Sequence, residues 1–106
     1  MATPIEPRFD EVIHAPHRLR ICVMVSAVDS MEFGALRDEL SVADSVLSKQ
    51  LKVLSDAGYV SLDKPKGRGG KMRTWVKITP DGRAALAAHL AELQRLAALA
   101  TNPSSA

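Results

Sequence analysis

The stretch Ala43–Trp75 decides the fold, and it reads ADSVLSKQLKVLSDAGYVSLDKPKGRGGKMRTW. Its first part predicts an amphipathic helix over about residues 44–57, because Leu47, Leu51 and Leu54 recur at the spacing that places side chains on one helical face. The opposite face carries hydroxyl, lysine and acidic side chains, namely Ser45, Ser48, Lys49, Lys52 and Asp56. A helix of this kind packs its leucines inward and presents the polar residues to solvent or to a partner.

A β-hairpin is expected after this helix, over about residues 59–78. Two segments of strand-forming residues, 59–63 and 73–78, flank a basic glycine-rich loop. Residues 42–78 contain eight Lys or Arg against three Asp, a net charge of +5, whereas the rest of the chain carries −3. Cationic charge concentrated on a helix and a hairpin is typical of nucleic-acid binding. A solvated hairpin with lysines that serve solubility would give the same count.

The residues before the amphipathic helix predict the first part of a helix-turn-helix. The expected elements are a helical turn at residues 8–13, a helix from Pro16 to about residue 28, a minor strand at residues 31–33 and a second helix at residues 34–40. A short turn then leads into the amphipathic helix, with Ser41 or Asp44 as its expected N-cap.

A long helix is expected at the end of the chain, over about residues 80–100. Thr79 as cap, Pro80 at the first position and Asp81 near the positive end of the dipole favour this start. Leucine and alanine cover most of its surface, which argues for a second copy of the chain as a partner. The alternative is that the helix only closes the core of its own domain. The expected dimer interface comprises Leu19, Val23, Leu86, Leu90, Leu93, Leu96 and Ala97.

The length of 106 residues predicts one domain, over residues 8–100, between a flexible arm at residues 1–7 and a flexible tail at residues 101–106. The most apolar run, Ile21–Val25, is too short to span a bilayer, and the N-terminus does not resemble an export signal. A single cysteine, Cys22, fits a reducing compartment. We therefore expect a cytoplasmic protein that does not bind membranes.

Enzymatic and metal-binding functions find little support in the sequence. The loop GRGGKMR resembles a phosphate-binding loop, but Pro65 and Met72 stand where that motif needs Gly and Ser or Thr. His14 and His17 lack accompanying thiolate or carboxylate ligands, and Cys22 lies on an apolar face where it acts as a small filler. No nucleophile with an adjacent base is evident. We expect no enzyme, no metal and no cofactor.

The order of helix, helix-turn-helix, two-stranded wing and closing helix is that of a winged helix, a mainly α fold with a small β-hairpin. The segments FDEVIHAPHRLRI, MEFGALRDEL, VADSVLSKQLKVLSDAGYV and WVKITPDGRAAL together resemble MarR/ArsR-type bacterial transcriptional regulators, especially the small stand-alone winged helix DNA-binding domains. The resemblance covers roughly Phe9 to Leu96. It implies a homodimer that binds double-stranded DNA sequence-specifically and controls transcription.

The resemblance also implies which residues contact DNA. On the recognition helix these are Ser45, Ser48, Lys49 and Lys52, with Gln50 added if the helix is rotated slightly. On the wing they are Lys66, Arg68, Lys71 and Arg73, which would lie on the backbone or in the minor groove. Two alternatives remain, a winged helix that serves protein–protein interaction and a non-specific architectural DNA-binding protein. Any small-molecule effector is expected between the first and last helices.

Overall fold

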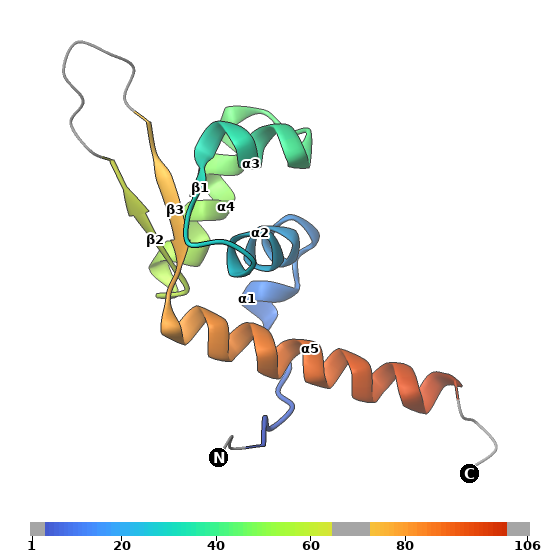
Figure 1. Ribbon diagram of the computed structural model, residues 1–106. Coiled ribbons are helices and arrows are strands. Elements are labelled where there is room, and N and C mark those ends of the chain that lie inside the picture. Colours follow the sequence, from blue (N-terminus) through green and yellow to red (C-terminus); the bar gives the residue numbers. More distant parts are fainter. Residues whose placement is uncertain (1–3, 65–72, 102–106) are drawn as a thin grey trace.

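The computed structural model of this chain describes residues 4–64 and 73–101. Within these ranges the fold is mainly helical with a small antiparallel sheet, as the sequence predicts (Figure 1). In chain order the elements are α1 (Glu11–His14), α2 (Pro16–Ser26), β1 (Met31–Glu32), α3 (Phe33–Leu40), α4 (Asp44–Asp56), β2 (Val60–Asp63), β3 (Trp75–Ile78) and α5 (Pro80–Thr101). None of these helices is long and apolar enough to cross a membrane.

The three strands form one antiparallel sheet in the order β1-β3-β2. Val60 pairs with Ile78 and Asp63 with Trp75, while the short β1 adds to the other edge of β3. Val60, Val76 and Ile78 are buried, so the inner face of the sheet closes one side of the core. Strands β2 and β3 lie at one side of the helices in Figure 1, with β2 packed against α4.

The core lies between α2, α3, α4 and the sheet. Helix α4 contributes the three leucines that the sequence spacing selects, and Leu47, Leu51 and Leu54 are all at most 2% exposed. The other core residues are Ile13, Ile21, Cys22, Val25, Leu36, Leu40, Val60, Val76, Ile78 and Leu86. Burial raises the pKa of the Cys22 thiol to about 11, and the nearby Asp10 carboxylate adds to this effect. Cys22 is thus a buried filler whose thiol stays protonated near neutral pH.

The turn between α3 and α4 is built differently from the sequence expectation. Ser41 adopts a left-handed conformation with φ of 55°, and its N–H bonds to carbonyls of α3, so it ends that helix. The N-cap of α4 is Ala43, which has no capping side chain, and Asp44 is the first helical residue. The predicted N-cap at Ser41 or Asp44 is therefore wrong, because the three-residue turn needs Ser41 to reverse the chain.

The start of α5 is fixed against the root of the hairpin. As expected, Thr79 caps the helix, with its Oγ1 accepting from the N–H of Gly82 at 2.9 Å. The N–H of Thr79 donates to the Tyr59 carbonyl at 3.0 Å. Gly82 itself packs on that carbonyl so closely that an added Cβ would lie 2.1 Å from the oxygen. Only glycine permits this approach, which sets the position of α5 relative to the hairpin.

A polar cluster ties the N-terminal segment to α5 and to the hairpin. The Asp10 carboxylate caps α1 through the N–H of Ile13 and accepts from the Tyr59 hydroxyl at 2.5 Å. Its backbone N–H donates to Nδ1 of His89 at 3.0 Å, and Nε2 of His89 lies 3.1 Å from Nδ1 of His14. The bond to Asp10, together with partial burial, raises the pKa of Tyr59 to about 12. Helix α5 is therefore held by hydrogen bonds as well as by packing.

Candidate nucleic-acid interface

The outward face of α4 is the centre of the candidate site. Ser45, Ser48, Lys49 and Lys52 are all exposed on it, opposite the buried leucines. Lys52 forms an ion pair with Asp56 at 3.4 Å, but both side chains are largely exposed, and such pairs contribute little. Lys52 can therefore leave this ion pair and bind a phosphate group instead. The four residues form one continuous polar and cationic surface on a helix whose other side is anchored in the core.

Gln50 does not share this face. Its side chain is half-buried, and its Oε1 accepts a hydrogen bond from Nη1 of Arg18 at 2.8 Å. Arg18 also donates from Nε to the Val12 carbonyl, so it links α1, α2 and α4. A base contact by Gln50 would require this hydrogen bond to break. The structure thus gives Gln50 a role in holding α4, which sequence periodicity alone did not indicate.

An open groove of about 520 Å³ separates α4 from the hairpin. The residues that α4 contributes to its wall include Ser48, Lys52 and Ser55, and Lys64 and Thr74 face them from the hairpin side. Hydroxyl and ammonium groups from both sides therefore line one concave surface, together with the carboxylates of Asp44 and Asp56 on the α4 side. The hydroxyl and ammonium groups are of the kind that bind phosphate oxygens in protein–DNA complexes. The lining of this groove adds Ser55, Lys64 and Thr74 to the residues that the sequence singled out.

The hairpin contributes cationic side chains at its root. Arg73 is exposed, and its Nε lies 3.5 Å from Oε2 of Glu32, a long and largely solvated contact. Lys64 is exposed on the other side of the hairpin. The other three predicted wing contacts, Lys66, Arg68 and Lys71, lie outside the described residues. The described root therefore carries one of the four predicted wing contacts, Arg73, and one further cation, Lys64.

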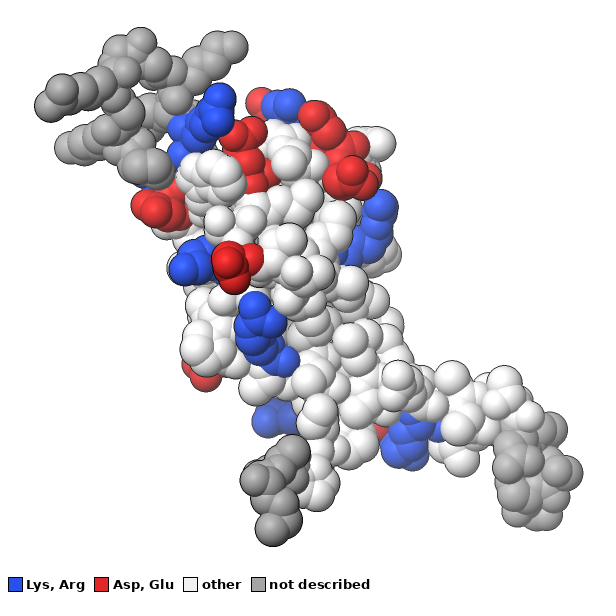
Figure 2. Space-filling view, in the orientation of Figure 1, with Lys and Arg blue, Asp and Glu red and all other residues white. Residues whose placement is uncertain are grey.

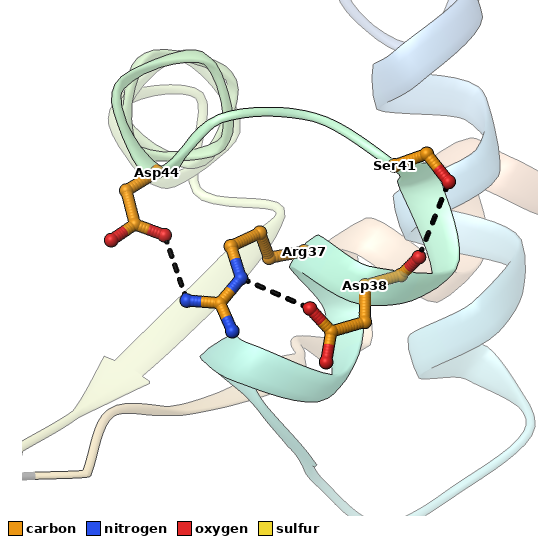
Figure 3. A network of polar contacts seen from close by, with 4 residues as sticks. All are labelled: Arg37, Asp38, Ser41 and Asp44. Atoms are coloured by element: carbon orange, nitrogen blue, oxygen red, sulfur yellow. Dashed lines mark hydrogen bonds and ion pairs between the residues drawn. The ribbon is translucent and has the colours of Figure 1, made fainter.

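A network of charged residues lies at the first turn of α4 (Figure 3). Arg37 of α3 donates from Nη1 to Oδ1 of Asp44 at 2.9 Å and from Nε to Oδ1 of Asp38 at 3.1 Å. These two bonds raise the pKa of Arg37 above its ordinary value. The sequence analysis missed this network, because it counted Asp44 only as a negative charge or a cap. A basic residue in α3 seven positions before an acidic one was the available signal.

The candidate dimer surface is only partly exposed. Val23, Leu96 and Ala97 are exposed, and Leu99, at 61%, is the most exposed large apolar residue of the described chain. Leu19, Leu90 and Leu93 are half-buried. Leu86 is 5% exposed within the domain's own core, which contradicts its expected place in a dimer interface. Figure 2 shows a largely uncharged surface over the C-terminal half of α5.

Two of the three histidines, His14 and His89, take part in packing within the fold. His14 and His89 bond to each other, and Phe9 packs against both rings at centroid distances of 4.6 and 4.9 Å. In residues 4–64 and 73–101, three or more potential metal ligands do not gather at any point. The described part of the chain thus offers no donor set for a protein-bound metal.

The sequence matches a family of DNA-binding domains, and the fold matches solved structures described as transcriptional regulators. Residues 17–97 match the family model described as winged helix DNA-binding domain. An uncharacterised protein of Methanocaldococcus jannaschii is 28% identical over 86 residues, which cover 81% of this chain and 92% of that protein. A structure of a transcriptional regulator homologue from Pyrococcus horikoshii OT3 superposes with a TM-score of 0.75 at 23% identity, over 82% of this chain and 85% of that one.

A second solved structure, of a possible transcriptional regulator for arsenical resistance, gives a TM-score of 0.63 at 29% identity. It covers 83% of this chain and 91% of that chain. The protein belongs to the winged helix DNA-binding domain family. Its resemblance to transcriptional regulators of the MarR/ArsR type, predicted from the sequence, is confirmed.

Proposed function

We propose that this protein is a homodimeric transcriptional regulator that binds double-stranded DNA sequence-specifically. Helix α4 enters the major groove, and the β2–β3 hairpin lies on the backbone or in the minor groove. The observation that carries the proposal is the exposed face of Ser45, Ser48, Lys49 and Lys52 on a helix anchored by three buried leucines. A rigid helix with a polar, cationic outer face is what major-groove binding requires.

The groove between α4 and the hairpin supports the same orientation. DNA that meets α4 would also meet Lys64, because this residue lines the groove opposite α4, and Arg73 is exposed on the neighbouring strand segment of the hairpin root. Lys66, Arg68 and Lys71 would extend the contact along the duplex. Lysine and arginine contacts to phosphates position the protein, whereas α4 supplies base contacts.

The homodimer rests on the exposed apolar surface of α5. Beyond Leu93 every described residue of this helix is exposed, and the apolar side chains of Leu96 and Leu99 are 42% and 61% exposed. Val23 of α2 is exposed as well. A second copy that covers these residues would pair two recognition helices, which would then meet successive major grooves about 34 Å apart.

Fluorescence anisotropy at two salt concentrations tests the DNA-binding proposal. The labelled duplexes are a randomised pool and the region upstream of the protein's own gene. We expect tight binding to one sequence, with affinity that falls steeply as salt rises, since bound phosphates release counterions. Lys52→Ala should weaken binding to all sequences and lower the salt slope by about one. Arg95→Ala is the matched control, because it removes a cation on α5 away from the site.

The same titrations identify the two alternatives. Equal and weak binding to every duplex would indicate a non-specific architectural protein. No binding at low salt would indicate a winged helix that binds proteins. The exposed lysines and serines of α4 favour DNA over a protein partner, since a protein-binding surface would be more apolar at its centre.

A further inference from the structure

We propose that Asp44 determines specificity by accepting a hydrogen bond from a cytosine in the major groove, and that Arg37 holds it in place for this contact. The proposal rests on the DNA-binding function proposed above. It concerns the charged network at the start of α4, where Asp44 is bonded to Arg37 (Figure 3).

The position of Asp44 suits a base contact. It is the first residue of α4, and recognition helices contact base edges mainly with their N-terminal residues. Its side chain is 67% exposed. Oδ1 accepts from Arg37, whereas Oδ2 points away from the guanidinium in Figure 3 and bonds to no other residue in the described ranges. One carboxylate oxygen is thus bonded to Arg37 and the other is available to a ligand.

The chemistry of a carboxylate selects cytosine. An ionised Asp accepts hydrogen bonds and donates none. In the major groove cytosine presents the N4 amino donor, whereas guanine presents two acceptors, N7 and O6, and thymine presents an acceptor and a methyl group. Adenine pairs its amino donor with the N7 acceptor, which suits an amide better than a carboxylate. Asp44 should therefore favour cytosine and repel guanine at one base pair of each half-site.

Arg37 makes an acidic residue tolerable at a surface that meets phosphates. Its guanidinium lies 2.9 Å from the Asp44 carboxylate and so offsets part of the negative charge that Asp44 and Asp38 present to the DNA backbone. It also holds the side chain from a different helix, because Arg37 lies on α3 and is held in turn by Asp38. A contact that is fixed before binding discriminates better than one that must be ordered on binding.

A simpler role for Asp44 would be structural. An acidic residue in the first turn complements the positive end of the helix dipole, and the ion pair joins α3 to α4. That role predicts that removal of the charge lowers stability and leaves base preference unchanged. The two roles therefore differ in one measurable property, the sequence that the variant selects.

Selection from a randomised duplex pool, followed by sequencing of the bound fraction, makes this measurement. The wild type should select a C·G pair at one fixed place in each half-site. Asp44→Asn has nearly the same shape but carries an amide, and we expect it to lose the cytosine preference by about 5- to 100-fold. Glu39→Gln is the matched control, since it removes one exposed carboxylate from α3 without changing the Arg37 network, and it should select the wild-type sequence.

A second variant, Asp44→Ser, is run beside Asp44→Asn in case one of them unfolds. The inference is overturned if the folded Asp44 variants select the same base as the wild type at every position. In that event selective binding by the wild type would still support the proposed function. If the wild type itself selects no sequence, both the proposed function and the inference fail.

Discussion

His89 is a polar side chain with 0% exposure, and its hydrogen bonds specify one protonation state. Its Nδ1 accepts from the backbone N–H of Asp10, so the neutral ring carries its proton on Nε2 and donates it to Nδ1 of His14. A proton added at Nδ1 of His89 would point at the backbone N–H of Asp10. Two hydrogen-bond donors would then face each other, and this hydrogen bond would be lost. Burial lowers the pKa of His89, and the neighbouring His14 adds to this effect while Asp10 opposes it.

This histidine should make the protein sensitive to acid. Because its pKa is lowered from 6.5 in the folded state, the unfolded chain takes up the proton first as the pH falls. The stability that neutral His89 contributes is complete above 6.5 and is lost as the pH falls through the folded-state pKa. We expect the free energy of unfolding by urea to drop between about pH 7.5 and about pH 5, and to drop less in His89→Gln.

Glutamine is the informative replacement, because its amide oxygen can still accept from Asp10 while the side chain does not titrate. The experiment compares how the free energy of unfolding of each protein changes with pH. A loss of stability that is the same at every pH therefore does not affect the comparison. Equal pH dependence in the two proteins would show that other groups govern the acid response.

Contacts of this kind lie beyond what the sequence could predict. His14 and His89 are 75 positions apart, and only the packing of α1 on α5 brings their rings together. The sequence analysis weighed His14 and His17 only as metal ligands, rejected that role, and did not connect His14 with His89. The same applies to Gln50, whose partner Arg18 is 32 positions away. The polar face of α4, by contrast, follows from spacing within the helix and was found directly.

Helix α5 depends on the close approach of Gly82 to the root of the hairpin. The Tyr59 carbonyl cannot easily move away from Gly82, because it accepts a hydrogen bond from the N–H of Thr79. A Cβ at position 82 would also lie 2.9 Å from Cγ1 of Ile78. We expect Gly82→Ala to lower the free energy of unfolding by about 1–3 kcal/mol or more, since the helix must shift to admit the methyl group.

Gly34→Ala serves as the control for this change. Gly34 is also helical, but the nearest atom to an added Cβ is the carboxylate oxygen of Glu32 at 3.1 Å, which is the end of a flexible side chain. Alanine should be neutral or stabilising there because it is the better helix former. Urea unfolding gives the free energy of unfolding of both variants. Equal values for Gly82→Ala and Gly34→Ala would contradict a tight contact at Gly82.

Among the helices and strands, the sequence predicted those whose signals lie within the element itself. Leucine spacing identifies α4, and the Thr79-Pro80-Asp81 signal identifies the start of α5. The minor strand was expected near Met31, but its partner was not, because β1 pairs with β3 from a distant part of the chain. The predicted N-cap of α4 was wrong for a local reason, since Ser41 ends α3 instead.

The shape of the whole molecule indicates how two copies would meet. Helix α5 has 22 residues, and Figure 1 shows its C-terminal half extending past the rest of the domain. Its N-terminal half is anchored by Leu86 and His89, whereas Leu96 and Leu99 are 42% and 61% exposed. The apolar surface that the sequence located thus divides into a part that closes the domain and a part that is free.

A charge on the free part should separate the proposed dimer. We expect the wild type to sediment as a dimer and Leu96→Glu as a monomer, because a carboxylate in an apolar interface is strongly unfavourable. Gln94→Glu adds the same charge on the opposite side of the helix and should leave the dimer intact. A wild type that is still monomeric at a protein concentration of about 100 μM would contradict the homodimer.

Trp75 is the one tryptophan of the chain, and it lies half-buried on the central strand, opposite both Glu32 and Asp63. Its indole sits where the hairpin leaves the body of the protein. Intrinsic fluorescence excited selectively at tryptophan therefore originates from this single place. The protein carries a built-in optical probe, and changes in emission on ligand addition report on the hairpin root without any label.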